Sequence, residues 1–325
     1  MAGSPEAEVL RYVPPRLRPA LEAALQPGGP RWLEVRLRAG LPLGVVTEAG
    51  DLWPDGRAAA PAPEAGISCT PEDVERAVQL VTQASVYAWE DELAQGFCTL
   101  PGGHRAGLCG RALRSGAAVR GQKAFTSVAL RVARAVPGAA DALLHALRAR
   151  RPGAAPGLLL FGPPGSGKTT VLRDLVRQLS AGRPDLGLPP RRVGVVDERS
   201  ELAACAGGCP QFDLGPRTDV LDGWPKAEGL VALVRAMGPE VVACDELGGP
   251  GDAGAVAEAG RCGVPVIATA HGGSVGDLLR RPGLAAALAS GVFGLAAGLR
   301  ADRRLGGLAA LPAAAGGEGA AWAPA

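Results

Sequence analysis

The sequence predicts two domains: a smaller α+β domain at the N-terminus and, after it, an α/β domain built on a mainly parallel sheet. The α/β domain is predicted because apolar runs and amphipathic runs alternate regularly in the second half of the chain. A glycine-rich loop joins the first of those apolar runs to the first amphipathic one, and a stretch of Arg, Pro and Gly without periodicity separates the two halves. We therefore expect domains at 1–147 and 157–305, a linker at 148–156 and a flexible tail at 306–325.

The composition is that of a globular protein. Hydrophobic residues make up 47% of the 325 residues and charged residues 20%, which is enough apolar material for two cores. The formal net charge of +2 argues against a protein devoted to nucleic acid. The seven cysteines are scattered, as is common in a reducing cytosol, and the first residues lack the apolar core of a secretory signal. The longest uncharged run, 282–299, is broken by glycines and predicts a buried helix followed by a strand. We expect a soluble, cytoplasmic protein.

The first half mixes helices and strands. Residues 9–25 predict a helix interrupted by prolines, and 32–38 alternate apolar with charged residues as a half-buried strand does. Thr70-Pro-Glu-Asp73 is a strong helix start, with Thr as N-cap, Pro in the first turn and acids near the positive helix end. That helix is expected to run to about residue 84. Shorter strands are expected at 97–100, 106–109 and 128–132, the first two joined by a tight turn.

The second half contains apolar runs of strand length that are each followed by a run with helical periodicity. The expected strands are 158–161, 192–196, 241–244, 264–269 and 292–299, and the expected helices are 169–180, 226–237, 252–261 and 275–280.

The strongest motif is the loop after the first of these strands, which matches the phosphate-loop pattern G-x-x-x-x-G-K-[ST] in full. Glycines let backbone N–H groups turn toward phosphate oxygens, and the following helix adds positive potential at its N-terminus. Lys168 is expected to bridge the β- and γ-phosphates, and Thr169 to bind Mg²⁺. The expected nucleotide-binding residues are Gly162, Pro163, Pro164, Gly165, Ser166, Gly167, Lys168, Thr169 and Thr170.

Two further strands end in acids. Asp245 and Glu246 follow the strand at 241–244, where Asp245 is expected to hold Mg²⁺ and Glu246 to polarise the attacking water. Asp197 and Glu198 end the strand at 192–196, between the phosphate-loop strand and the Asp245 strand in sequence. This extra strand, with the Glu next to the metal-binding Asp, favours the RecA-like branch of phosphate-loop proteins. Because the sequence has no guanine-reading Asn/Thr-Lys-x-Asp motif, ATP is the expected nucleotide.

The histidines differ in their expected roles. His271 ends the strand at 264–269 and therefore lies at the carboxyl edge of the sheet, where it can sense the γ-phosphate. His145 is expected on a helix surface. For His104, in the turn at 101–104, no role is predicted.

Longer blocks give a family resemblance that extends over residues 10–305. The blocks that carry it are Thr70–Asp73, Gln83–Glu92, Gln95–Arg111, Val196–Glu201, Asp213–Asp222, Pro225-Lys226 and Ala270-His271. In these blocks the chain resembles the stage III sporulation protein AA family, within the wider group of secretion and pilus motor ATPases.

The resemblance implies a mother-cell ATPase that forms a homohexameric ring at the cytoplasmic face of a membrane channel between mother cell and forespore. It assigns Glu198, with Asp197, to an acidic box, Glu246 to the Walker B glutamate and His271 to a histidine box. The wider group has an Arg two residues after the Walker B Glu, where this chain has Gly248. An arginine must then come from elsewhere; the candidates are Arg111, Arg131, Arg134 and Arg199.

The sequence therefore predicts a Mg²⁺-dependent ATPase of RecA-like fold, with Lys168, Glu198, Glu246 and His271 as catalytic residues. Its expected partners are ATP, further copies of itself and membrane-embedded sporulation channel proteins. Two other functions stay open: a nucleic-acid-dependent motor, which the near-neutral charge disfavours, and a nucleotide-gated assembly protein with little turnover.

Overall fold

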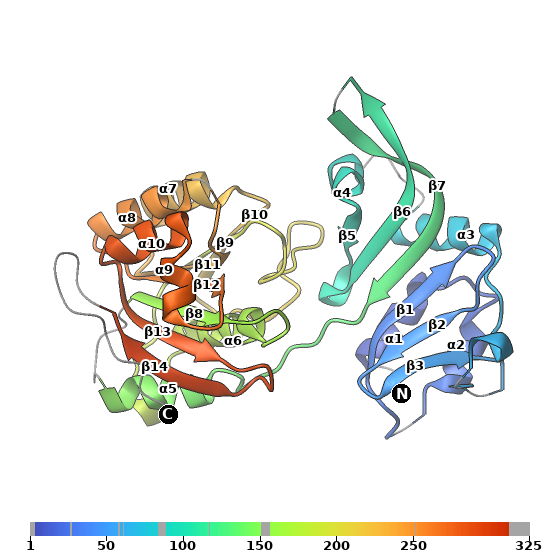
Figure 1. Ribbon diagram of the computed structural model, residues 1–325, viewed down its shortest axis with the longest axis horizontal. Coiled ribbons are helices and arrows are strands. Elements are labelled where there is room, and N and C mark those ends of the chain that lie inside the picture. Colours follow the sequence, from blue (N-terminus) through green and yellow to red (C-terminus); the bar gives the residue numbers. More distant parts are fainter. Residues whose placement is uncertain are drawn as a thin grey trace. The chain divides into compact units, whose positions relative to one another are not determined.

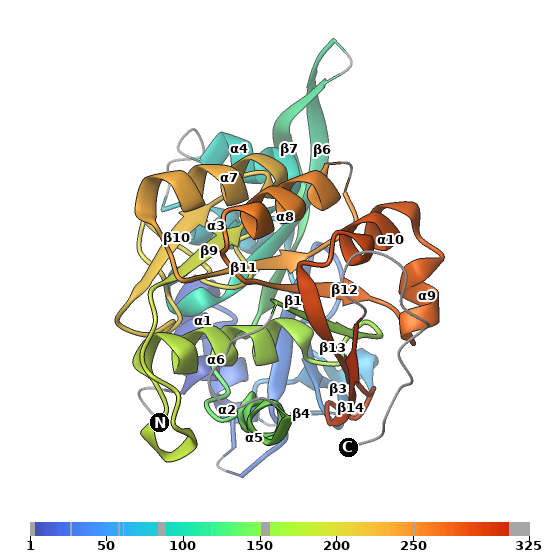
Figure 2. The same cartoon turned by 90° about the vertical axis from the view of Figure 1, so that its left-hand side faces the viewer.

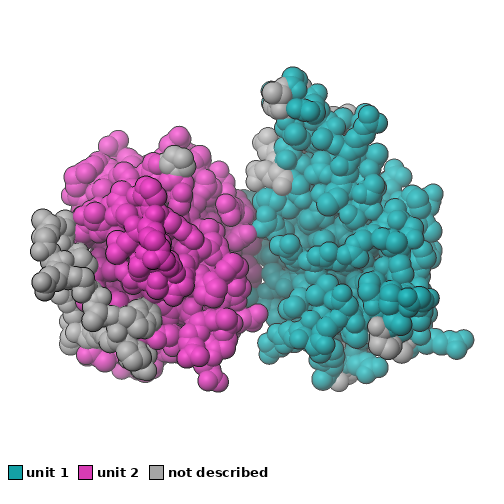
Figure 3. All heavy atoms as spheres, in the orientation of Figure 1, with its two compact units in different colours: residues 1–134, 206–211 teal, residues 135–205, 212–325 magenta. Residues whose placement is uncertain are grey.

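The computed structural model divides into two compact units, coloured separately in Figure 3. Unit 1 comprises residues 1–134 with 206–211, and unit 2 comprises residues 135–205 with 212–325. The structure describes residues 4–26, 28–57, 59–60, 62–83, 89–116, 118–150, 157–249 and 251–311. None of the helices in these ranges is both long enough and apolar enough to cross a membrane.

Unit 1 is an antiparallel sheet packed against helices (Figure 1). The strand order is β4-β3-β2-β1-β7-β6-β5, and α3 packs on β1 and β7. The strands are β1 (Trp32–Arg38), β2 (Gly44–Thr47), β3 (Gly50–Pro54), β4 (Ala59–Ala60), β5 (Phe97–Thr99), β6 (Arg105–Ser115) and β7 (Ala118–Arg131). The helices are α1 (Pro5–Val9), α2 (Arg18–Ala24), α3 (Pro71–Val81) and α4 (Glu90–Gln95).

The start of α3 confirms the predicted capping. Thr70 Oγ1 accepts a hydrogen bond from the Asp73 N–H at 3.2 Å, and Asp73 Oδ2 accepts one from the Thr70 N–H at 2.8 Å. This reciprocal capping box satisfies two backbone donors that the helix itself leaves free. Arg16 Nε lies 3.1 Å from the Asp73 carboxylate, so the cap also ties α3 to the segment before α2.

Unit 2 is an α/β unit with the strand order β10-β9-β11-β12-β8-β13-β14, parallel except for the β13–β14 pair. Both faces of the sheet are covered: α5 and α6 contribute to the core on one face, and α7, α8 and α10 to the core on the other. The strands are β8 (Gly157–Gly162), β9 (Val193–Asp197), β10 (Thr218–Asp222), β11 (Val241–Glu246), β12 (Val266–His271), β13 (Phe293–Leu299) and β14 (Leu305–Ala310). The helices are α5 (Asp141–Arg150), α6 (Lys168–Ala181), α7 (Lys226–Met237), α8 (Asp252–Arg261), α9 (Val275–Leu279) and α10 (Pro282–Ala289).

The predicted boundaries need two corrections. Residues 148–150 are the end of α5 rather than a linker, because Leu143 and Leu144 anchor this helix in the core of unit 2, and the two units divide between 134 and 135. Residues 306–310 belong to β14 rather than to a tail, since β14 pairs with β13 along its length. The rest of the predicted linker (151–156), the end of the tail (312–325) and residues 84–88 of the Gln83–Glu92 block lie outside the described residues.

Unit 1 contains more strand than predicted. The strands β2 and β3 were not predicted, and β6 and β7 form a hairpin much longer than the short strands expected there. Unit 1 also includes residues 206–211 from the second half of the sequence, where Gln211 Oε1 accepts a hydrogen bond from the Gly102 N–H at 2.9 Å.

Candidate functional site

The glycine-rich loop lies between β8 and α6, as predicted. Gly165 and Gly167 have φ angles of +74° and +84°, a left-handed conformation that glycine adopts without strain. A Cβ atom on Gly165 would meet no atom within 4 Å, whereas one on Gly162 would lie 2.6 Å from Leu299 O. The first position of the motif is therefore glycine because the backbone of β13 approaches it closely, and the fourth because of its backbone conformation.

The donors of this loop fit a phosphate chain. Helix α6 begins at Lys168 without a side-chain N-cap, so its first N–H groups are available to an anion and carry the positive end of the helix dipole. Ser166 Oγ is buried and has no hydrogen-bond partner in the described part of the chain. Lys168 is 7% exposed, and burial lowers the pKa of its ammonium. A loop with such donors and one cation suits a chain of phosphate groups.

A chain of hydrogen bonds leads from this loop to the acids of β11. Lys168 Nζ donates to Gly162 O at 3.0 Å and to Pro163 O at 2.9 Å, and lies 3.1 Å from His271 Nδ1. Because an ammonium can only donate, Nδ1 is the acceptor of the imidazole and Nε2 carries the proton. His271 Nε2 lies 3.1 Å from Glu246 Oε2, so it donates to that carboxylate. Lys168, His271 and Glu246 come from three different elements and meet at one edge of the sheet.

Two arginines lie beside this chain. Arg199 Nη1 is 3.8 Å from Glu246 Oε2, and Arg281 Nη1 donates to His271 O at 2.8 Å. Of the predicted candidates, Arg199 is thus placed near the glutamate. Arg131 and Arg134 instead pair with Glu34 and Glu6 inside unit 1.

Asp245 and Glu198 share a buried cation that is not among the predicted site residues. Lys226, at the first position of α7, is 5% exposed, and its Nζ contacts Glu198 and lies 3.1 Å from Asp245 Oδ1. Burial raises the pKa of Asp245 to about 6, although Lys226 acts against this. The hydrogen bonds from Lys226 to the two carboxylates outweigh its own burial and raise its pKa. Asp245 is thus held close to a cation at the position predicted to hold Mg²⁺.

Asp197 stabilises the loop that follows β9. It is completely buried, and its two carboxylate oxygens accept hydrogen bonds from the N–H groups of Glu201, Leu202 and Ala203 at 2.7–3.0 Å. These bonds fix the loop after β9 and so set the direction in which Glu198 and Arg199 leave the strand.

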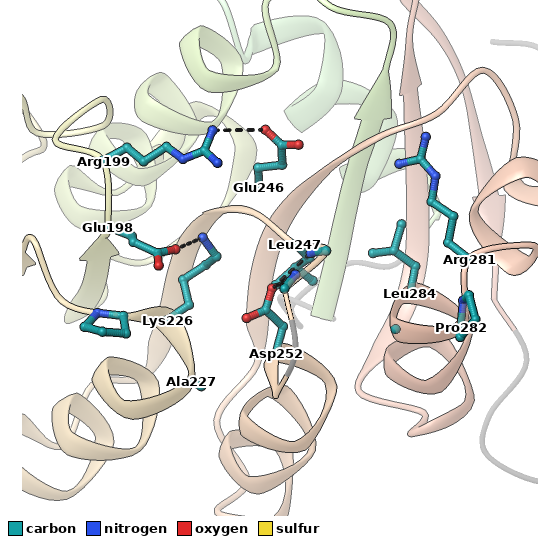
Figure 4. Close-up of a pocket in the computed structure, with 14 residues that line it drawn as sticks. Glu198, Arg199, Lys226, Ala227, Glu246, Leu247, Asp252, Arg281, Pro282 and Leu284 are labelled. Atoms are coloured by element: carbon teal, nitrogen blue, oxygen red, sulfur yellow. Dashed lines mark hydrogen bonds and ion pairs between the residues drawn. The ribbon is translucent and has the colours of Figure 1, made fainter. Parts of the chain in front are cut away.

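A cavity of about 590 Å³ opens next to Glu246 (Figure 4). Its walls come from the ends of β9 and β11 and from the starts of α7, α8 and α10. The charged residues among those that line it are Glu198, Arg199, Lys226, Glu246, Asp252 and Arg281. Asp252 caps the loop between β11 and α8, accepting hydrogen bonds from the N–H groups of Gly248 and Gly249 at 2.9 and 2.8 Å. The polar groups of this wall are largely engaged with one another.

Comparison with known proteins identifies the family. The sequence pattern of the family described as "Sporulation stage III, protein AA" matches residues 6–309. The chain belongs to the sporulation stage III protein AA family. It is 38% identical over 280 residues to stage III sporulation protein AA of Bacillus subtilis, an alignment that covers 85% of each chain.

Other proteins resemble this chain more distantly, one in sequence and two in fold. The protein SEEDLING PLASTID DEVELOPMENT 1 of Arabidopsis thaliana is 28% identical over 184 residues, which are 56% of this chain and 25% of that protein. The structure of the ATPase DotB from Legionella pneumophila matches with a TM-score of 0.51 at 14% identity, covering 89% of this chain and 77% of that one. DotB from Yersinia pseudotuberculosis gives the same TM-score at 13% identity, covering 82% and 70%. The predicted fold, a RecA-like α/β domain with a smaller α+β domain, is confirmed.

In the structure, the predicted catalytic and metal-binding residues of this chain form two clusters. Lys168, His271 and Glu246 form one hydrogen-bonded chain, and Glu198 and Asp245 form a second cluster around Lys226. His145 is exposed on α5, as predicted. His104, for which no role was predicted, is buried in unit 1, where it accepts a hydrogen bond from the Ala133 N–H. The sequence signal for Lys226 was its rarity, since the chain has three lysines, and its place at a predicted helix start.

Proposed function

We propose that the chain is a Mg²⁺-dependent ATPase whose hydrolysis is carried out at the carboxyl edge of the unit 2 sheet. The observation that carries the proposal is the chain Lys168–His271–Glu246, which links the phosphate-binding loop to a carboxylate. Membership of the sporulation family and the likeness to the DotB fold support it.

In this proposal the N–H groups of residues 165–170 and the Lys168 ammonium bind the β- and γ-phosphates. Thr169 and Asp245 would hold Mg²⁺, which supplies positive charge to the phosphate oxygens. Glu246 accepts a proton from water as the water oxygen bonds to the γ-phosphorus, and the bond from that phosphorus to the ADP oxygen breaks. His271, by donating to Glu246 from Nε2, keeps one carboxylate oxygen fixed and leaves the other for the water.

We further propose that the protein acts as a homo-oligomeric ring, with six copies as the family resemblance implies. It would work in the cytoplasm against membrane-embedded sporulation channel proteins on the mother-cell side.

The test is light scattering after size-exclusion chromatography, with ATP and Mg²⁺ present and phosphate release followed in parallel. Glu246→Gln keeps a hydrogen-bond acceptor for His271 but removes the base, so ATP binding should persist while phosphate release falls at least about 100-fold. Glu228→Gln, an exposed substitution of the same kind on α7, is the matched control and should behave like the unsubstituted protein. Full turnover in Glu246→Gln would refute the proposal. ATP-dependent assembly without turnover in any variant would favour a nucleotide-gated assembly protein.

A further inference from the structure

The turn between β13 and β14, residues 300–304, lies against the glycine-rich loop. A Cβ atom on Gly167 would lie 3.8 Å from both Cβ and Cγ of Arg303, so the aliphatic part of this arginine covers the last glycine of the loop. Arg303 is exposed, and its guanidinium makes no ion pair or hydrogen bond within the described residues. An unpaired cation therefore stands directly beside the phosphate-binding loop.

Arg303 has a strained backbone conformation, and within the described residues its guanidinium makes no ion pair or hydrogen bond that would offset this strain. Its φ angle is +66°, a left-handed conformation that glycine would adopt at lower cost. The turn is held by backbone hydrogen bonds, from Arg303 N to Arg300 O and from Arg300 N to Arg304 O, both 2.9 Å. Strained residues of this kind concentrate where a side chain contacts a ligand.

The sheet order shows which part of a nucleotide this turn would meet. Relative to β8, the strands β12 and β11 with His271 and Glu246 lie on one side, and β13 and β14 lie on the other. Figure 2 shows β13 and β14 side by side at one end of this sheet and β10 at the other. A triphosphate on the loop with its terminal phosphate toward Glu246 must therefore extend its nucleoside toward β13 and β14.

We propose that Arg303 binds the nucleoside of ATP, with its planar guanidinium stacked on the base; this rests on the proposed function. The phosphates already have the loop N–H groups, the start of α6 and Lys168 as partners. Residues 299–306 contain no aromatic side chain, so the planar groups that the turn can offer to a base are guanidinium groups, and among its arginines Arg303 is the one whose side chain lies against Gly167.

Calorimetric titration with two ligands, ATP and inorganic tripolyphosphate, tests this on the full chain. Arg303→Ala and Arg303→Gly should each weaken ATP binding about tenfold, the size of a cation–π contact removed, and leave tripolyphosphate binding within about twofold. Arg304→Ala removes an equal charge from the same turn and should change neither affinity by more than about twofold. Arg303→Gly should melt no lower than the unsubstituted protein, because glycine relieves the φ strain.

Three other results would contradict this inference, each for a different reason. Unchanged ATP affinity in both Arg303 variants would overturn the inference and leave the nucleotide site intact. An equal loss for ATP and tripolyphosphate would show a phosphate contact and overturn the nucleoside assignment. If the unsubstituted protein binds neither ligand, the proposed function fails, and this inference fails with it.

Discussion

Replacing Lys226 with Met tests how the acidic end of the site is held together. Met keeps most of the apolar stem but removes the ammonium that contacts Glu198 and lies 3.1 Å from Asp245. Asp245 is 4% exposed, so it would be left as a buried carboxylate without its cation. Breaking a buried ion pair in this way costs about 3–5 kcal/mol. We expect the lower end, about 3 kcal/mol, because the partly exposed Glu198 can be rehydrated and Asp245, whose pKa is about 6, can take up a proton.

The assay is urea-induced and thermal unfolding of the full chain at about pH 7.5. A loss of about 3 kcal/mol lowers the melting temperature of a domain of this size by roughly 6–12 °C. Adding Asp245→Asn to Lys226→Met should restore much of the loss, because an amide needs no counterion. Lys123→Met is the control, since Lys123 is an exposed lysine of β7.

Two results would refute this reasoning. One is a Lys226→Met protein that unfolds within about 0.5 kcal/mol of Lys123→Met, which is the range of ordinary surface substitutions. The other is a double variant no more stable than Lys226→Met alone, because the loss would then come from packing and not from the unpaired charge.

Three further predictions concern the stability of the two units. Gly157→Ala should prevent stable folding, because its Cβ would lie 1.9 Å from Val292 O between paired strands. Gly254→Ala lies in open space on α8 and should instead raise the free energy of unfolding by about 0.5–1 kcal/mol. Equal melting temperatures of the two variants would contradict this prediction. Asp197→Asn should cost about 2 kcal/mol in chemical unfolding, because hydrogen bonds to a charged oxygen are lost, and a change below about 0.5 kcal/mol would show that the loop does not depend on them. Burial lowers the pKa of His104 below its usual 6.5. As the pH falls below 6.5, His104 therefore takes up a proton in the unfolded chain before it does so in the folded chain. The free energy of unfolding falls over this range, until the pH reaches the pKa of His104 in the folded state. His104→Gln should flatten this part of the pH dependence when urea midpoints are compared at about pH 7.5 and about pH 5.5, and an unchanged slope would rule His104 out as its source.

The sequence predicted the central strands of unit 2 best, because these strands are buried on both faces of the sheet. The strand Leu158–Phe161 is buried on both faces, so it appears as an unbroken apolar run, and the same holds for β11 and β12. Such strands belong to parallel sheets covered by helices on both sides. The loop after β8 was predictable for a different reason, because its glycines and its lysine are required by local backbone geometry and phosphate chemistry.

Edge strands carry a weaker signal. Thr218–Asp222 (β10) is half-buried and contains two aspartates, so nothing in its hydropathy separates it from a loop. The strand β14 consists of Leu, Gly and Ala, a composition that does not distinguish an edge strand from a tail. An edge strand pairs with a neighbour on one side only, so its residues need not form the continuous apolar run of a central strand. Lys226 was missed for a related reason, since its partners are 28 and 19 residues away and only the parallel crossovers bring them together.

Three acids at the carboxyl edge, Asp245, Glu198 and Glu246, are each paired with a cation from another element. Asp245 and Glu198 face Lys226, and Glu246 faces His271 and Arg199. A buried charge needs an ion-pair or hydrogen-bond partner, so a substitution of one residue also changes the energy of its neighbour. Glu246→Gln removes both the proposed base and the partner of Arg199, whereas Arg199→Gln removes the ion pair alone. Loss of phosphate release in Glu246→Gln but not in Arg199→Gln therefore assigns the effect to the carboxylate as a base, and a similar loss in both shows that phosphate release also depends on Arg199.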